Sequence, residues 1–318
     1  MTLIILLIVL VTERVALQGD NWRVERYLGW YIEHGSKSLL KKADDNLALF
    51  IFVAIPAIVF GIVLMLLGSD LIDFIVSLLV LAVCVGNASV RTFYRQYLNA
   101  QNRKDEEAQQ LLQAKLLAAD GIEVELFQTE EDKAKQEDVQ QDKTQQTEQT
   151  ETSQPDNSDN NQDEQALGKT TELNIGEILI WNNFKYYAAP IFYFVLFGVP
   201  GVVFYATLLY LVESQLLHRQ FDNLSYLKQA KKTLSTWLEW ANWVPSRLVA
   251  IGYMFVGHFS NGLETWLKLA ANFQVSSQSL ICQVASAAEG DAPENNAKPM
   301  VKLAKRNMVF FLVIVRSE

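Results

Sequence analysis

The chain has 318 residues, a formal net charge of −9 at pH 7 and a hydrophobic content of 50%. The hydrophobic residues are concentrated in long runs separated by polar stretches, which excludes a uniform soluble domain. Two cysteines and three isolated histidines give no disulfide framework and argue against a zinc site, which needs about four clustered ligands. We therefore expect no metal, no cofactor and no nucleic-acid partner.

Residues 1–45 combine an apolar segment with a basic amphipathic region. The apolar run 3–11 is too short to cross a bilayer, which takes about 20 residues in a helix, so we expect it to be re-entrant or buried in a bundle. No basic residue precedes this run and no small-residue cleavage site follows it. The sequence therefore predicts a retained segment and not a cleaved secretory signal.

Residues 46–89 predict a transmembrane hairpin. The stretch 46–68 has no ionisable side chain, and its length suits a hydrocarbon core of roughly 30 Å. The stretch 70–88 follows almost directly and is charged only at its start, at Asp70 and Asp73. Basic residues flank the hairpin at its outer ends, which the positive-inside rule places in the cytoplasm. They are Arg14, Arg23, Arg26, Lys37, Lys41 and Lys42 before it and Arg91, Arg95, Arg103 and Lys104 after it.

Residues 90–119 predict a cytoplasmic helix, and residues 120–170 form an acidic insert rich in Gln. Between residues 120 and 165 the chain has 15 Asp and Glu against three Lys, so the negative charge of the protein resides in this segment. Such a tract cannot bury enough apolar surface to offset its ordering entropy, which predicts disorder. It is either a solvated linker or an interaction tail.

Residues 171–266 predict a broken transmembrane span followed by a Trp-rich pocket region. The apolar run 186–212 is interrupted by Pro190, Gly198, Pro200 and Gly201, which membrane helices tolerate when neighbours satisfy the freed backbone groups. A full crossing would place the basic stretch 215–239 outside the cell. Either the run dips and returns to the same side, or a cationic arm lies outside.

The stretch NWVPSRL (242–248) follows Trp237 and Trp240, which with Trp243 share one helix face and suit a membrane interface. Pro245 and Arg247 predict a helix start at which free N–H groups, the helix dipole and a guanidinium would bind an anion. The alternative is that Arg247 only anchors the helix at the interface.

Residues 267–318 predict a C-terminal helix and an apolar tail that is short for a final span. Together these elements predict an all-α, polytopic membrane protein with about four spans and a disordered acidic loop.

Three segments resemble the AmpE family, inner-membrane partners of the amidase AmpD in bacterial β-lactamase induction. They are TLIILLIVLVTERVALQGDNW, WNNFKYYAAPIFYFVLFGVPG and NWVPSRLVAIGYMFVGHF, in that order. The resemblance covers nearly the whole chain except the acidic insert. It implies a multi-pass protein of the inner membrane that senses or modulates cell-wall signalling during peptidoglycan recycling, with a functional link to AmpD.

The AmpE family in turn resembles the CobD/CbiB membrane enzymes, which form an amide bond in cobalamin synthesis. Their acidic block is matched here by Trp181, Asn182, Lys185 and Tyr186, so both of its carboxylates are missing. Of a second acidic pair only Glu239 remains. Because metal-held phosphates need carboxylate ligands, the resemblance implies binding without ligation and no catalytic residue.

The resemblance implies a cationic, aromatic ligand pocket instead. Lys185 and Arg247 would bind the anion and Trp181 and Tyr187 would form walls. The remaining candidate site residues are Asn182, Glu239, Glu13 and Arg14. A muropeptide or a lipid-linked cell-wall precursor, in contact with the lipid bilayer, is the expected ligand class.

Two alternatives remain open. The chain could be a CobD/CbiB-like amide-forming enzyme on an unknown substrate, with Glu13, Glu177 and Glu239 as the replacement carboxylates. It could also be a membrane assembly protein that recruits a partner through its acidic loop.

Overall fold

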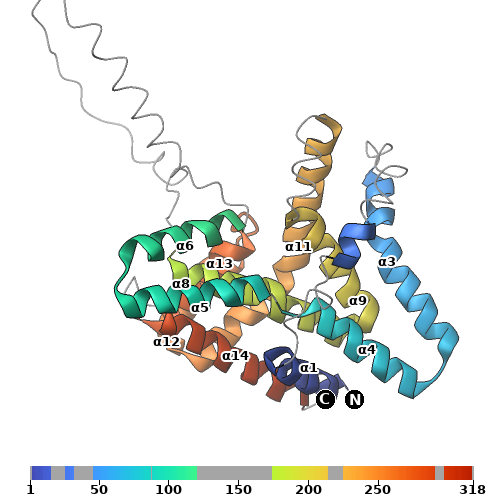
Figure 1. Ribbon diagram of the computed structural model, residues 1–318, viewed down its shortest axis with the longest axis horizontal. Coiled ribbons are helices and arrows are strands. Elements are labelled where there is room, and N and C mark those ends of the chain that lie inside the picture. The colour runs from blue at the N-terminus through green and yellow to red at the C-terminus, as the bar shows by residue number, and fades with distance from the viewer. Residues whose placement is uncertain are drawn as a thin grey trace, which may run out of the picture.

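The computed structural model describes residues 2–15, 26–31, 46–86, 88–119, 174–213, 225–290 and 297–316. This part of the chain contains helices and no strand, which confirms the predicted all-α class (Figure 1). The elements are α1 (Thr2–Val15), α3 (Asn46–Leu67), α4 (Asp70–Cys84), α5 (Ala88–Arg103), α6 (Glu106–Ala119), α8 (Ile175–Asn183), the π-helical turn η4 (Phe184–Ala188), α9 (Ala189–Glu213), α11 (Ser225–Val256), α12 (Phe259–Ala270), α13 (Ser277–Glu289) and α14 (Lys298–Arg316). The acidic insert 120–170 lies outside the described residues, so its disorder stays a prediction.

Helices α3 and α4 are joined by two residues, Gly68 and Ser69. Gly68 has a φ of 55°, the left-handed conformation that ends many helices and that glycine adopts at little cost. Asp70 and Asp73 then occupy the first turn of α4, where carboxylates favour the positive end of the helix dipole. α3 packs against α9, and α4 packs against α1 and α9.

The segment formed by α8, η4 and α9 folds back on itself at Gly198, which has a φ of 65° inside α9. In a straight helix Tyr193 and Tyr205 would be about 18 Å apart, yet their rings stack with centroids 5.1 Å apart. Lys185 and Glu213 would be about 42 Å apart, yet they form an ion pair. Both pairs are centred on residue 199, so the segment is a helical hairpin with its tip at Gly198.

Glycine is also required just after this tip. A Cβ added at Gly201 would lie 2.6 Å from the carbonyl oxygen of Tyr193 and 2.5 Å from the Cβ of Phe197. The two arms therefore approach too closely for a side chain at this position. Of the two arrangements left open by the sequence for 186–212, the structure has the one in which the chain returns. We call the segment 184–213 the return hairpin.

Three of the prolines within helical segments, Pro56, Pro190 and Pro245, each free the carbonyl four residues earlier, because proline has no N–H to donate. The carbonyl of Phe52, freed by Pro56, accepts the Tyr31 hydroxyl at 2.8 Å. The carbonyl of Tyr186, freed by Pro190, accepts the backbone N–H of Gly86 at 2.9 Å.

Pro245 frees the carbonyl of Ala241 in the same way. This carbonyl accepts the Tyr193 hydroxyl at 2.8 Å, so the first arm of the return hairpin is bonded to α11 at its proline. In each case another part of the chain replaces the missing helical hydrogen bond. This is the arrangement that a helix in an apolar environment needs, because an unpaired carbonyl is costly there.

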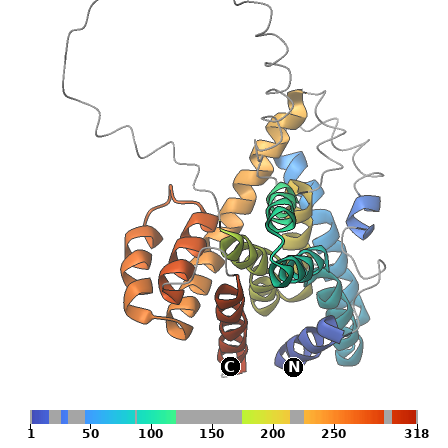
Figure 2. The same ribbon diagram turned by 60° about the vertical axis from the view of Figure 1, so that its left-hand side comes forward.

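The C-terminal helices form the other half of the molecule. α11 packs against α13, α12 and α14, and α8 packs against α13 and α14. In Figure 2, α14 lies between helices α12 and α13 on one side and helices α3 and α4 on the other, and both chain termini lie at one end. The expected boundary at residue 266 lies inside α12, and the residues expected to form one cytoplasmic helix belong to two, α5 and α6.

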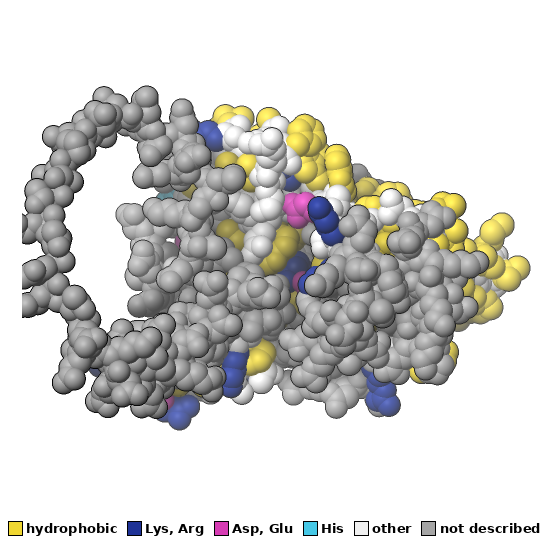
Figure 3. Space-filling view, turned by 90° about the horizontal axis from the view of Figure 1, so that it is seen from above, with side chains coloured by type: hydrophobic (Ala, Val, Ile, Leu, Met, Phe, Trp, Pro, Cys, Tyr) yellow, Lys and Arg dark blue, Asp and Glu magenta, His cyan; other side chains and the backbone are white. Residues whose placement is uncertain are grey.

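Two helical segments of the described chain, Asn46–Leu67 and Ile175–Glu213, are long and apolar enough to cross a membrane. Many apolar side chains of α3 point outward, and Met65 and Leu66 are 87% and 80% exposed. Figure 3 shows hydrophobic side chains gathered over the end of the molecule that α3 and α4 form. An exposed apolar surface of this kind is typical of contact with lipid.

Candidate functional site

The open end of the return hairpin carries a buried charge cluster, formed by Lys185, Tyr186 and Glu213. The Lys185 ammonium lies 2.5 Å from Oε1 of Glu213, and the Tyr186 hydroxyl donates to Oε2 at 2.5 Å. The side chains of Lys185 and Glu213 are 3% and 17% exposed. A carboxylate on one arm therefore pairs with an ammonium and accepts a hydroxyl hydrogen bond from the other arm.

Aromatic rings surround the Lys185 ammonium. It lies 5.6 Å from the ring centroid of Trp181 and 5.5 Å from that of Tyr186, within the range of cation–π attraction. The π-helical turn that holds Lys185 and Tyr186 is a local irregularity of a kind that often occurs at functional sites. The predicted aromatic wall at Trp181 is thus beside the predicted cation.

Asn182 and Tyr187 lie close in sequence but serve other contacts. The Asn182 amide is buried and donates to the Ile178 carbonyl at 2.9 Å, within its own helix. Tyr187 packs into the cluster formed by α1, α4 and α9. Its hydroxyl accepts a hydrogen bond from Arg91 at 3.5 Å. The rings that lie next to the Lys185 ammonium are those of Trp181 and Tyr186.

Sequence reasoning missed Glu213. A signal for it exists, because Lys185 and Glu213 are the charges that bound the uncharged run 186–212. Two opposite charges at the ends of a run with glycine and proline at its centre are the pattern of a hairpin that closes on an ion pair.

Arg247 is 7% exposed and does not lie at a helix start. α11 begins at Ser225 and continues through Pro245 to Val256, so the prediction of a helix N-terminus at NWVPSRL is wrong. The helix continues because the Tyr193 hydroxyl satisfies the carbonyl that Pro245 leaves free. The free N–H groups expected to bind an anion beside Arg247 are therefore within the helix.

The guanidinium of Arg247 is bonded to the end of α12 and to its own helix. It donates to the carbonyls of Ala270 at 3.4 Å, Asn272 at 3.5 Å and Trp243 at 3.2 Å, and it lies 4.5 Å from the Trp243 ring centroid. Burial lowers the pKa of Arg247, and the Glu239 carboxylate opposes that shift. These contacts join α11 to the C-terminal end of α12, where a cation is favoured.

Glu239 accepts a hydrogen bond from the backbone N–H of Ser277, at the first turn of α13. Glu177 caps α8 by accepting the N–H of Asn174 at 3.2 Å, and it also accepts the Ser286 hydroxyl at 3.0 Å. Glu13 and Arg14 belong to α1, but their side chains lie outside the described part of the structure. Among the described residues, no group of three or more His, Cys, Asp or Glu is placed to hold a metal ion.

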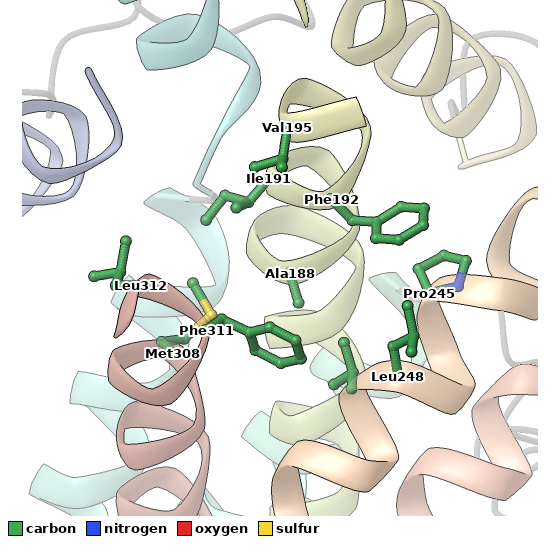
Figure 4. Close-up of a pocket in the computed structure, with 10 residues that line it drawn as sticks. Ala188, Ile191, Phe192, Val195, Pro245, Leu248, Met308, Phe311 and Leu312 are labelled. Atoms are coloured by element: carbon green, nitrogen blue, oxygen red, sulfur yellow. The ribbon is translucent and has the colours of Figure 1, made fainter. Parts of the chain in front are cut away.

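A cavity of about 80 Å³ lies between the first arm of the return hairpin, α11 and α14 (Figure 4). All ten lining residues are apolar. Those that point into it include Ile191 and Val195 from α9, Pro245 and Leu248 from α11, and Met308 and Leu312 from α14.

Comparison with known proteins identifies one family. The model of the family described as regulatory signalling modulator protein AmpE matches residues 1–141 and 161–317. Protein AmpE of Shigella flexneri is 21% identical to the chain over 325 residues, which cover 99% of this chain and 96% of that protein. No solved structure matches the chain. The unmatched residues 142–160 fall within the acidic insert.

Proposed function

Because this chain belongs to the AmpE family of regulatory signalling modulator proteins, we propose that it modulates β-lactamase induction and cell-wall signalling from the inner membrane. The observation that carries the proposal is the charge cluster of Lys185, Tyr186 and Glu213 within an apolar helical segment. Burying two charges costs desolvation energy, so a buried ion pair at the mouth of an otherwise apolar hairpin is a candidate ligand site.

In the membrane, α3 and α4 cross as a hairpin and the return hairpin enters and leaves from one face. Its tip at Gly198 is about 20 Å from Lys185 along the helix, less than the roughly 30 Å of a hydrocarbon core. The basic residues Lys231 and Lys232 then lie on the cytoplasmic side with Arg91 and Arg95. This multi-pass arrangement is supported by the positive-inside rule, because every basic stretch faces the same compartment.

The ligand of the charge cluster is an anionic cell-wall-related molecule, either a muropeptide or a lipid-linked precursor. Its carboxylate or phosphate competes with Glu213 for Lys185, which opens the mouth of the return hairpin. A functional link between this protein and the amidase AmpD is part of the same proposal. The acidic insert would be the segment that contacts a partner. Of the three carboxylates considered for an amide-forming enzyme, the two whose side chains the structure describes, Glu177 and Glu239, bond helix N-termini, so no contact of theirs favours that alternative.

The test is complementation of β-lactamase induction. In a bacterium with an inducible β-lactamase and its own copy deleted, the wild-type chain is expected to restore the normal response to inducer. Lys185→Met and Glu213→Gln are expected to behave like the deletion although their protein levels in the membrane are normal. The control is Glu264→Gln, which removes a charge from an exposed ion pair with Lys268. Full restoration by both cluster variants would contradict the proposal.

A further inference from the structure

The apolar cavity beside the return hairpin is accessible from the surface of the molecule. Leu248, which lines it, is 43% exposed. Phe255 on the same helix and Val309 on α14 are each 60% exposed. The cavity therefore opens into an apolar surface and not into a polar cleft. Apolar cavities without polar partners are not hydrated, and they accept apolar guests.

Helix α14 changes from basic to apolar at the edge of this cavity. Lys302, Lys305 and Arg306 are exposed and precede Met308 and Leu312, which line it. Arg306 bonds Glu289 at 3.2 Å. Lys302 and Lys305 have no acidic partner among the described residues. Lys305 lies one turn before Met308 and two turns before Leu312, so it shares their helix face.

From this arrangement we infer that the cavity binds a short stretch of one hydrocarbon chain of an anionic phospholipid, whose phosphate contacts Lys302 and Lys305. The charge of the lysines selects a negative headgroup, since each basic residue near a membrane surface attracts anionic lipid. A water-soluble sugar peptide is excluded because the lining offers it no hydrogen bond. The inference rests on the proposed membrane location but not on the role in β-lactamase induction.

The test is lipid binding to the full chain purified in a mild detergent, measured by native mass spectrometry with dioleoyl phosphatidylglycerol and, separately, dioleoyl phosphatidylcholine. Two variants fill the cavity, Ala188→Leu and Val195→Phe. A third, Lys302→Gln with Lys305→Gln, removes the two charges. Leu267→Phe, at an exposed apolar site on α12 away from the cavity, and Lys231→Gln with Lys232→Gln are the matched controls.

The wild-type chain and both controls are expected to retain one phosphatidylglycerol molecule more tightly than phosphatidylcholine, by roughly tenfold or more. The cavity-filling variants are expected to lose this molecule while their thermal stability stays equal or rises. The lysine variant is expected to lose the preference between the two lipids. Equal binding of both lipids by the wild type, or unchanged binding in the folded cavity-filling variants, would overturn the inference. If the cavity-filling variants lose the lipid as expected while Lys185→Met and Glu213→Gln still restore induction, the inference stands and only the proposed function is contradicted.

Discussion

Replacement of Glu213 by alanine is expected to lower the free energy of unfolding by about 3–5 kcal/mol, the loss typical when one member of a buried ion pair is removed. The Lys185 side chain is 3% exposed, so its ammonium would remain buried without its carboxylate. The Tyr186 hydroxyl would also lose its acceptor. Because Lys185 and Glu213 lie on different arms, the return hairpin would open at its mouth.

Titration with sodium dodecyl sulfate in mixed micelles, followed by tryptophan fluorescence, measures this loss. The double variant Lys185→Met with Glu213→Leu is expected to recover most of the stability, since a well-packed apolar pair replaces a buried ion pair at little net cost. Lys268→Met removes one member of an exposed pair and is expected to change nothing measurable. A Glu213→Ala protein as stable as the wild type would show that the pair does not hold the arms together.

Tyr193→Phe is expected to cost about 1–3 kcal/mol, because the carbonyl of Ala241 would lose its donor while Pro245 still blocks the helical bond. In a Pro245→Ala background the same substitution is expected to cost much less, since the new backbone N–H of residue 245 can bond that carbonyl. A double-mutant cycle on the unfolding free energies measures this coupling.

Tyr205→Phe is the matched control for this cycle. Its hydroxyl donates at 3.0 Å to the side chain of Asn242, one residue beyond Ala241, and not to the freed carbonyl. Its effect is therefore expected to be the same with proline or alanine at residue 245. Additive losses for Tyr193→Phe and Pro245→Ala would mean that the hydroxyl does not replace the missing helical bond.

The sequence predicted those elements that depend on neighbouring residues in the chain. The absence of ionisable residues in 46–68 predicted the apolar helix α3, and Pro190, Gly198 and Pro200 marked the break in the next apolar segment. The glycines and prolines alone left open the direction of the chain after that break. Glycine and proline interrupt a helix, but the contacts of Tyr193 with Tyr205 and of Lys185 with Glu213 decide that it turns back.

The candidate site was predicted less well, for a related reason. Lys185 and Trp181 are adjacent as expected, but the main partner of Lys185 is 28 residues away. Pro245 was expected to begin a helix, because proline usually interrupts one. The helix continues because the Tyr193 hydroxyl bonds the carbonyl of Ala241, and these two residues are 48 positions apart in the sequence. The partners of Arg247 include the backbone carbonyls of Ala270 and Asn272, 23 and 25 residues away, which no side-chain pattern reveals. The relationship to the CobD/CbiB enzymes stays a prediction.

The most direct test of the account is the side of the membrane on which the chain emerges after the return hairpin. Single cysteines are placed at Lys232, Arg95 and Asp70 in a background without Cys84 and Cys282, and intact and permeabilised spheroplasts are treated with a membrane-impermeant maleimide. We expect Asp70→Cys to react in intact spheroplasts, and Arg95→Cys and Lys232→Cys to react only after permeabilisation. Reaction of Lys232→Cys in intact spheroplasts, with Arg95→Cys protected, would show that the segment crosses the membrane and would contradict the account.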